Sequence, residues 1–181
     1  MKEIINITSK NPDIKLGTLV KDIIKEDLII VCIGTDKFIG DALGPIVGSI
    51  LTEYKFPFPV YGTIHDPIHA LNLDTKINEI KKKHKSSFIV AIDACLGTKS
   101  EVGDIYLRDT PISPGRGVGK LLTEVGDISI VGIIAKSASE DFLYSNNIRL
   151  SLVYDIANII SKGLINAYNQ WLFRYIDSNM H

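Results

Sequence analysis

The chain has 181 residues, of which 45% are hydrophobic and 23% charged, and its formal net charge is -1. This length suits a single domain with a sizeable core, and the balance of apolar and charged residues excludes a disordered polypeptide. The near-zero charge gives no reason to expect nucleic-acid binding, and no apolar run approaches the ~20 residues needed to cross a bilayer.

No repeat, low-complexity tract or linker divides the sequence, so we expect residues 1–181 to form one domain. The first ten residues, MKEIINITSK, contain no apolar stretch like that of a signal peptide, which favours a cytoplasmic protein. Cys32 and Cys95 both lie in apolar surroundings in the sequence. We expect them to be free, buried thiols rather than a disulfide.

The first third of the chain predicts a helix, a strand and a second helix. Apolar residues at helical spacing predict an amphipathic helix over 16–25. The run Leu28–Ile33 is apolar throughout and rich in β-branched residues, which is typical of a strand buried on both faces, and Gly34 ends it. A second helix is expected over 41–54, with Asp41 as its capping residue and a proline in its first turn.

The rest of the chain continues this alternation. The expected elements are a strand over 59–64, a helix over 68–84, a strand over 88–92 stopped by Asp93, a weaker strand over 104–108, a strand over 128–135 and a long helix over 148–173. Strands that alternate with helices indicate an α/β protein, in which an open, mostly parallel sheet is covered by helices on both faces.

Two aspartates are expected at the edge of this sheet where ligands bind. Open α/β sheets bind ligands beyond the carboxyl ends of their strands, where the strand order reverses. Asp93 follows the strand over 88–92, and Asp41 follows the loop after the strand over 28–33. If these strands are neighbours, both carboxylates face one crevice and could divide the acid and base roles, because each charge raises the pKa of the other group. They could instead hold a metal ion; taken singly, Asp41 could be only a helix cap and Asp93 only a turn residue.

Two histidines are candidates for a third group in this crevice. His65 and His69 are four residues apart, with Pro67 between them. Because the strand before them should lie beside the strand over 28–33, either histidine could reach Asp41. His69 is the stronger candidate, as a substrate-binding group, and packing at the start of a helix is the alternative.

A glycine-rich stretch is the other candidate substrate-binding element. Gly115, Gly117 and Gly119 alternate with other residues just before Lys120. We interpret the stretch as a loop over the crevice, whose backbone N–H groups could bind an extended peptide or polarise a carbonyl. A plain flexible loop is the alternative.

The sequence also resembles a known group of proteins. Residues 34–45, GTDKFIGDALGP, resemble the first motif of the spore germination protease, and residues 89–94, IVAIDA, resemble its second. Residues 114–120, PGRGVGK, resemble its glycine-rich stretch, and residues 127–135 match the apolar strand that follows. The short chain and the segment HDPIHA at 65–70 point more narrowly to the YyaC-type sporulation proteins.

The resemblance implies a fold and a set of roles. Hydrogenase maturation endopeptidases share the fold, which implies three layers around a five-stranded sheet of order 2-1-3-5-4 with strand 4 antiparallel. In germination proteases the aspartates that match Asp41 and Asp93 are the functional pair, and the substrates are small acid-soluble spore proteins. In hydrogenase maturation proteases the matching residues help to bind nickel together with a histidine. That histidine would fall near 114–119, where this chain has none.

Three hypotheses follow. The leading one is a sporulation-associated peptidase of the forespore or spore interior, which uses Asp41 and Asp93 as an acid/base pair on a protein or peptide substrate and needs no cofactor. The second is a non-catalytic sporulation protein that binds a peptide or partner in the same crevice. The third is a metal-dependent maturation endopeptidase. Related proteins range from monomers to tetramers, so the sequence leaves open whether the chain forms a homo-oligomer.

Overall fold

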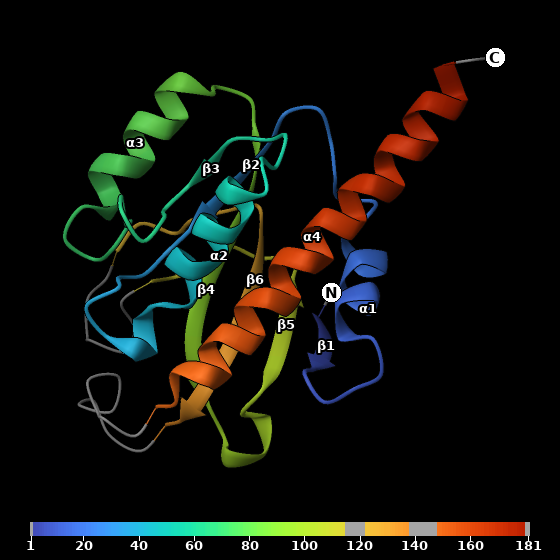
Figure 1. Ribbon diagram of the computed structural model, residues 1–181. Helices are drawn as coiled ribbons and strands as arrows, with labels where there is room; N and C mark the ends of the chain where they lie inside the picture. Colours follow the sequence, from blue (N-terminus) through green and yellow to red (C-terminus); the bar gives the residue numbers. More distant parts are fainter. Residues whose placement is uncertain (1, 115–121, 138–147, 180–181) are drawn as a thin grey trace.

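The computed structural model describes residues 2–114, 122–137 and 148–179. Within these residues one sheet is covered by helices (Figure 1). The strands are β1 (Lys2–Asn6), β2 (Leu28–Cys32), β3 (Val60–Tyr61), β4 (Phe88–Gly97), β5 (Asp104–Arg108) and β6 (Ile128–Lys136). The helices are α1 (Pro12–Val20), α2 (Leu43–Glu53), α3 (Leu73–Lys83) and α4 (Leu150–Asn179), with short 3-10 helices η1 (Ile39–Asp41) and η2 (Lys99–Glu101).

The strand order of the sheet is β1-β5-β6-β4-β2-β3. β3, β2, β4 and β6 are parallel to one another, whereas β5 runs antiparallel to β6 and β1 antiparallel to β5. If β1 is left out, β2 to β6 become strands 1 to 5 in chain order. Read from the β3 edge, the order is then 2-1-3-5-4, and the fourth strand (β5) is antiparallel, so the predicted topology is confirmed. The prediction of five strands was one short, because the N-terminal strand β1 adds a sixth at the edge.

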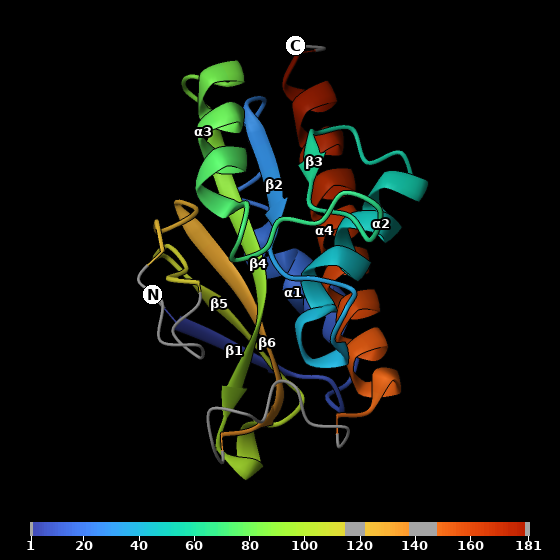
Figure 2. The ribbon, with the colours of Figure 1, turned by 90° about the vertical axis from the view of Figure 1, so that its left-hand side faces the viewer.

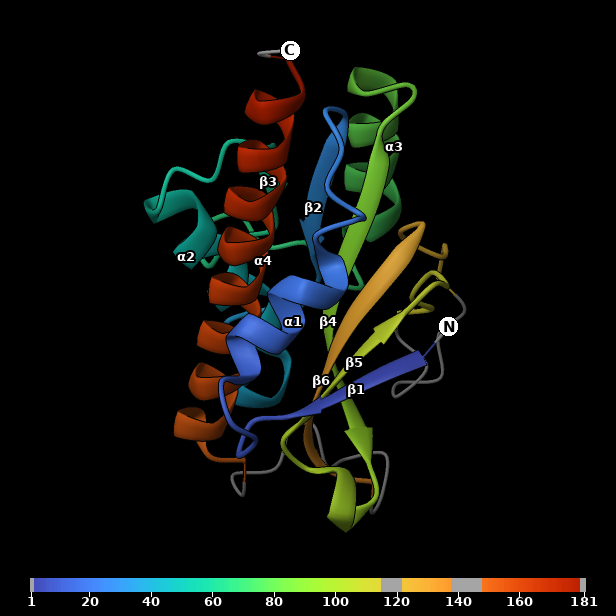
Figure 3. The same cartoon turned by 90° about the vertical axis from the view of Figure 1, so that its right-hand side faces the viewer.

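Helices cover both faces of the sheet and create two cores. α1, α2 and α4 lie together on one face, and α3 lies on the other (Figures 2 and 3). Successive side chains of a strand point to opposite faces, so β2 contributes Ile30 and Cys32 to the first core and Ile29 and Val31 to the second. All five residues of β2 are buried, as its apolar sequence predicts. Among the described helices, α4 included, none has the length and hydropathy that crossing a membrane would require.

Several predicted boundaries were wrong. The helix expected over 68–84 begins at Leu73, because the Asn72 side chain holds the residues before it in a turn. The Oδ1 of Asn72 accepts the N–H of His69 (2.8 Å), and its amide donates to the carbonyl of Pro67 (3.0 Å). The strand expected over 59–64 pairs with β2 for two residues only. The last helix extends past the expected residue 173 to Asn179.

One buried hydroxyl in α4 gives a stability prediction. Ser161 is fully buried, and its Oγ has no hydrogen-bond partner among the described residues. Burying an unpaired hydroxyl costs about 1–3 kcal/mol, and alanine is also the better helix former. We expect Ser161→Ala to raise the free energy of unfolding by about 1 kcal/mol, measured by urea denaturation. Ser178→Ala in the same helix is the control, because the Ser178 hydroxyl is exposed and donates to the carbonyl of Tyr175 (3.0 Å). An equal gain in both variants would contradict the burial argument.

Candidate functional site

Asp41 is placed by a loop that closes on itself between β2 and α2. The N–H of Gly34 donates to the carbonyl of Ile68 (2.7 Å), and the N–H of Thr35 donates to the carbonyl of Asp41 (2.9 Å). Gly34 has a φ of 136°, a conformation that favours glycine. A Cβ at Gly34 would lie 2.0 Å from the Asp41 carbonyl oxygen. The end of the loop is therefore held against its beginning, which fixes the main chain of Asp41.

The Asp41 side chain does not cap α2, contrary to one sequence-based expectation. The residue that precedes the helix is Ala42, and no side chain caps the helix start. The Asp41 carboxyl is instead partly buried. Burial raises its pKa to about 6, although a backbone hydrogen bond from Thr35 opposes the shift. Asp41 is thus a carboxyl group that titrates close to neutral pH and is not consumed by a capping role.

Asp93 lies inside β4 rather than after it. β4 was expected to stop at residue 92, but it continues to Gly97, and Asp93 pairs in register with Val131 of β6. The carboxyl is partly buried, and its Oδ1 accepts the N–H of Ala94 (2.8 Å). The interpretation of Asp93 as a turn residue is therefore wrong. Burial raises the pKa of Asp93 well above its usual range, and the nearby charge of Asp41 raises it further.

The two aspartates come together as the sequence predicts. β2 and β4 are neighbours, and η1, which ends at Asp41, contacts both β4 and α4. The charge of Asp41 raises the pKa of Asp93, so the two carboxyl groups lie within electrostatic reach of each other. Two acids that share a partly buried site cannot both ionise easily, so one of them retains its proton to a higher pH. Such a pair offers an acid and a base at the same pH.

Cys95 lies two residues beyond Asp93 on the same face of β4. Its thiol is partly buried and directed to the carbonyl of Leu96 (Sγ to O, 3.3 Å). Burial, followed by the charge of Asp93, raises the pKa of Cys95. A thiol that stays protonated is a poor nucleophile. This agrees with the interpretation of Cys95 as a packed residue.

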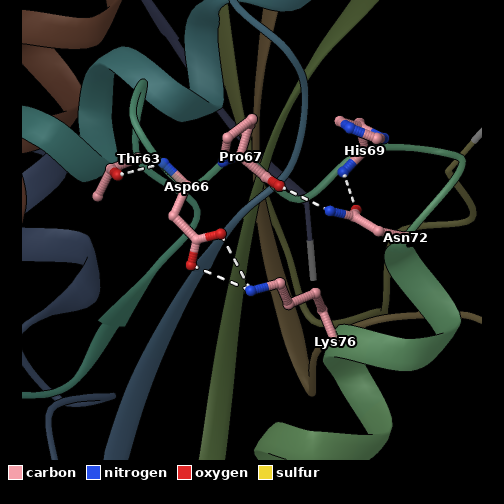
Figure 4. A network of polar contacts seen from close by, with 6 residues as sticks. All are labelled: Thr63, Asp66, Pro67, His69, Asn72 and Lys76. Atoms are coloured by element: carbon pink, nitrogen blue, oxygen red, sulfur yellow. Dashed lines mark hydrogen bonds and ion pairs between the residues drawn. The ribbon is translucent and has the colours of Figure 1, made fainter.

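His69 lies beside the start of the Asp41 loop, and His65 is exposed. Ile68 bridges to Ile33 as a parallel strand would, which places His69 next to the end of β2. The Nδ1 of His69 accepts the N–H of Leu71 (3.3 Å). Figure 4 shows the turn around it, in which Asp66 also forms an ion pair with Lys76. Within the described residues, neither histidine forms a hydrogen bond or ion pair with Asp41 or Asp93, and a substrate-binding role for His69 stays a prediction.

The glycine-rich stretch cannot be placed. Gly115, Gly117 and Gly119 lie outside the described residues. Ile112 and Val125, which flank the stretch, exchange two backbone hydrogen bonds (2.9 Å each) and pack on the same core as α3. The proposed role of the three glycines in substrate binding stays a prediction.

A nickel site is not formed by the described residues. They contain no group of three or more His, Cys, Asp and Glu side chains that could hold a metal ion. Asp41 and Asp93 alone supply two carboxylates, whereas transition metals in proteins are generally held by at least three side chains that include imidazole or thiolate. The donor set does not fit nickel, and we assign no step to a metal.

Sequence reasoning missed two parts of the site. Thr35 is buried and connects the loop to Asp41, but nothing in the sequence distinguishes it from a surface threonine. Phe38 and Ile39 are 39% and 41% exposed on the same loop. Two large apolar residues in an otherwise polar loop are a signal that could have been used, because exposed apolar side chains near a site often contact a ligand.

A shallow hollow elsewhere on the surface lacks such chemistry. It lies between α1 and the C-terminal part of α4 and is lined by residues that include Lys21, Phe173 and Arg174. Arg174 forms an exposed ion pair there with Asp22 (2.9 Å). No carboxyl with a raised pKa lines it, so the Asp41–Asp93 pair remains the candidate site.

Comparisons with known proteins agree with this architecture. A family model described as "Protein of unknown function (DUF1256)" matches residues 4–163. The chain is 47% identical over 138 residues to "Uncharacterized protein YyaC" of Bacillus subtilis (strain 168). The aligned residues make up 76% of this chain and 67% of that protein. A solved structure, the [NiFe] hydrogenase maturation protease HycI from Thermococcus kodakarensis KOD1, is similar with a TM-score of 0.53 and 18% identity, covering 81% of this chain and 99% of that one. At this identity the likeness shows a shared fold.

Proposed function

Because the chain belongs to the DUF1256 family and has the fold of a hydrogenase maturation protease, we propose that it hydrolyses peptide bonds with Asp41 and Asp93. The observation that carries the proposal is the coupled pair itself. Two carboxyl groups from separate elements share a partly buried site, and both have raised pKa values. Buried carboxyls without a cationic partner destabilise a fold, so their presence at a sheet edge favours a functional role.

The two pKa shifts suggest how the roles divide. The pKa of Asp41 is about 6, so its carboxylate is mostly ionised at neutral pH and can take a proton from water. Burial and then the charge of Asp41 raise the pKa of Asp93, so in this scheme Asp93 is the group that keeps its proton to the higher pH and donates it to the scissile carbonyl oxygen. The hydroxide adds to the carbonyl carbon, and collapse of the tetrahedral species breaks the C–N bond. The proton on Asp41 then passes to the leaving amine, and the Asp93 carboxylate takes back the proton of the carbonyl oxygen. This yields one carboxylic acid and one amine and restores the starting protonation of the pair.

The proposed substrates are small acid-soluble spore proteins, as the resemblance to germination protease implies. The proposal places the protein in the cytoplasm of the forespore or in the spore interior. The support for the substrate is the sequence likeness over residues 34–45, 89–94 and 114–120. It is separate from the support for the catalytic pair, and a different protein substrate would leave the pair unaffected.

The test is cleavage of a purified small acid-soluble spore protein by the full chain, followed by mass spectrometry. We expect a rate that rises with pH through an apparent pKa near 6, as Asp41 ionises, and falls again when the pair loses its second proton. Asp41→Asn should lower the rate ~10²- to 10⁴-fold, the usual contribution of a general base. Asp36→Asn is the matched control, because Asp36 is an exposed carboxylate in the same loop.

An unchanged rate in Asp41→Asn would remove the catalytic assignment. Saturable binding of the spore protein without any turnover would favour the non-catalytic hypothesis, in which the crevice binds a peptide or partner. Titration with nickel by calorimetry tests the metal-dependent hypothesis, for which we expect no binding at the Asp41–Asp93 pair.

A further inference from the structure

β4 continues beyond the end of its neighbour β2. The last pair between them joins Cys32 to Ile92, and β4 then runs on for five residues, from Asp93 to Gly97, paired on its other side with β6. Figure 2 shows this part of β4 extending past β2 toward the β4–β5 turn. Burial changes at the same point, because Val90–Ile92 are buried whereas Asp93–Gly97 are all partly exposed. Within the described residues, no strand therefore pairs with β4 beyond Ile92 on the side of β2.

The direction of the hydrogen bonds identifies the groups that face this position. The carbonyl of Ile92 accepts the N–H of Ile33 (2.7 Å) on the β2 side, and the carbonyl of Gly97 accepts the N–H of Ser137 (2.8 Å) on the β6 side. Backbone groups of successive strand residues point to alternate sides. The carbonyl and N–H groups of Ala94 and Leu96 therefore point to the side that β2 leaves open.

Two of these four groups have a hydrogen-bond partner among the described residues, and two have none. The N–H of Ala94 is bound by Asp93 Oδ1 (2.8 Å), and the carbonyl of Leu96 receives the weak thiol donor of Cys95 (3.3 Å). The carbonyl of Ala94 and the N–H of Leu96 have no main-chain partner within the described ranges, which omit 115–121 and 138–147. One acceptor and one donor at this spacing are what an added strand would bond to.

We propose that an extended segment of the protein substrate adds to β4 at Ala94 and Leu96, in the position where β2 ends. This deepens the proposed function and rests on it for the chemistry, since the added strand would run past Asp93 and close to η1, which contacts β4 and ends at Asp41. Phe38, which precedes η1, and Ile39, its first residue, are exposed and would contact side chains of the segment. Binding through main-chain groups depends on the extended conformation of the segment and on few of its side chains. The protein would therefore bind unfolded or flexible segments.

A substrate segment fits this position better than a second copy of the chain. The edge without a strand partner is two residues long, and η1 contacts both β4 and α4. A single extended segment needs only one strand's width, about 4.8 Å between neighbouring strands. Two folded copies would need a longer and fully exposed edge.

The test uses the full chain with the Asp93→Asn substitution, so that the probe is not cut, and a small acid-soluble spore protein as the probe. Hydrogen–deuterium exchange is measured by NMR. We expect the Leu96 amide to exchange quickly in the free protein and at least about tenfold more slowly with the probe. The Ile33 amide, already bonded to Ile92, is the internal control and should not change.

A second measurement asks whether the probe is bound as a strand. Peptides from the protected region of the probe are made with single amide-to-ester replacements, each of which removes one N–H donor. We expect the replacement facing the Ala94 carbonyl to weaken binding about three- to tenfold, and replacements at the two adjacent positions to have no effect. Loss at consecutive positions, or none, would overturn strand addition.

The outcomes separate this inference from the proposed function. Cleavage by the wild-type protein without protection of Leu96 removes strand addition and leaves the peptidase. Protection of Leu96 without cleavage by the wild type supports strand addition and removes the catalytic assignment. Protection that rises with protein concentration in the absence of probe indicates pairing between copies and overturns the choice of occupant. If the wild type does not cut the probe and the probe does not protect the Leu96 amide, both proposals are wrong.

Discussion

Replacing Asp93 by asparagine is expected to slow hydrolysis strongly and, at the same time, to stabilise the folded protein above neutral pH. Asparagine has nearly the same shape but no proton to donate, so the rate should fall ~10²- to 10⁴-fold. The same change removes a carboxyl whose ionisation is opposed by burial and by Asp41. The two effects have opposite signs, a combination expected when a fold carries destabilising groups for a function.

The pH dependence follows from the direction of the shift. The folded-state pKa of Asp93 lies above the value of about 3.9 that an unfolded chain has. The protonated group therefore contributes stability that is fully present below pH ~4 and is lost as the pH rises through the folded-state pKa. An asparagine side chain does not titrate, so Asp93→Asn should show little advantage at pH 4 and a melting temperature several degrees higher at pH 8.

The measurement is thermal unfolding of wild type and variant between pH 4 and pH 8. Asp41→Asn should behave in the same way over a defined range, because the pKa of Asp41 rises from 3.8 to about 6 and the corresponding stability is lost between these values. A shift of this size corresponds to about 2–3 kcal/mol, since each pKa unit is worth about 1.4 kcal/mol. Asp36→Asn, with an exposed carboxylate, should not change the melting temperature. Variants of Asp93 and Asp41 that melt like the control at pH 8 would show that the pair is not buried and coupled.

Much of the fold could be predicted from the sequence because local patterns, such as apolar runs and turn residues, determine most of its strands and helices. The apolar run over 28–33 is typical of a strand buried on both faces, and Leu28–Cys32 form such a strand. The strand over 104–108 has the predicted bounds, since the turn before it contains Gly103, which adopts a φ of 94°. β1 was missed because Lys2–Asn6 is five residues long and shows no alternation. Its strand conformation comes from pairing with β5, a contact that no local pattern encodes.

The site was predictable in its location but not in its details. The rule that ligands bind beyond the carboxyl ends of parallel strands brought Asp41 and Asp93 together before the structure was known. The end of β4 was misplaced because it is set by β6, which continues to Lys136 and pairs with residues beyond Asp93. Asp41 was interpreted as a possible cap because a sequence does not show that the loop from Gly34 returns to it. Long-range pairing decided both points.

Replacing Gly34 by alanine is expected to have the largest effect on stability of any change at the site. A Cβ there would lie 2.0 Å from the Asp41 carbonyl oxygen and 3.1 Å from the ring of Pro45, and the φ of 136° is itself strained for alanine. Since the nearest atom belongs to the backbone, relief requires the loop to open and the Thr35–Asp41 bond to break. We expect a loss of about 3–5 kcal/mol in the free energy of unfolding, measured by urea denaturation.

Gly103→Ala separates the two causes of this loss. Gly103 has a φ of 94°, but the nearest atoms to its Cβ would be side-chain atoms of Ile7 at 3.3 Å. It should therefore lose only about 1–2 kcal/mol, the cost of backbone strain, and keep full hydrolytic activity. Equal losses in the two variants would mean that backbone strain alone explains Gly34. A larger loss in Gly34→Ala, together with an Asp41 pKa that returns toward 3.8, would show that contact between the two ends of one loop keeps this carboxyl in the partly buried site where it is coupled to Asp93.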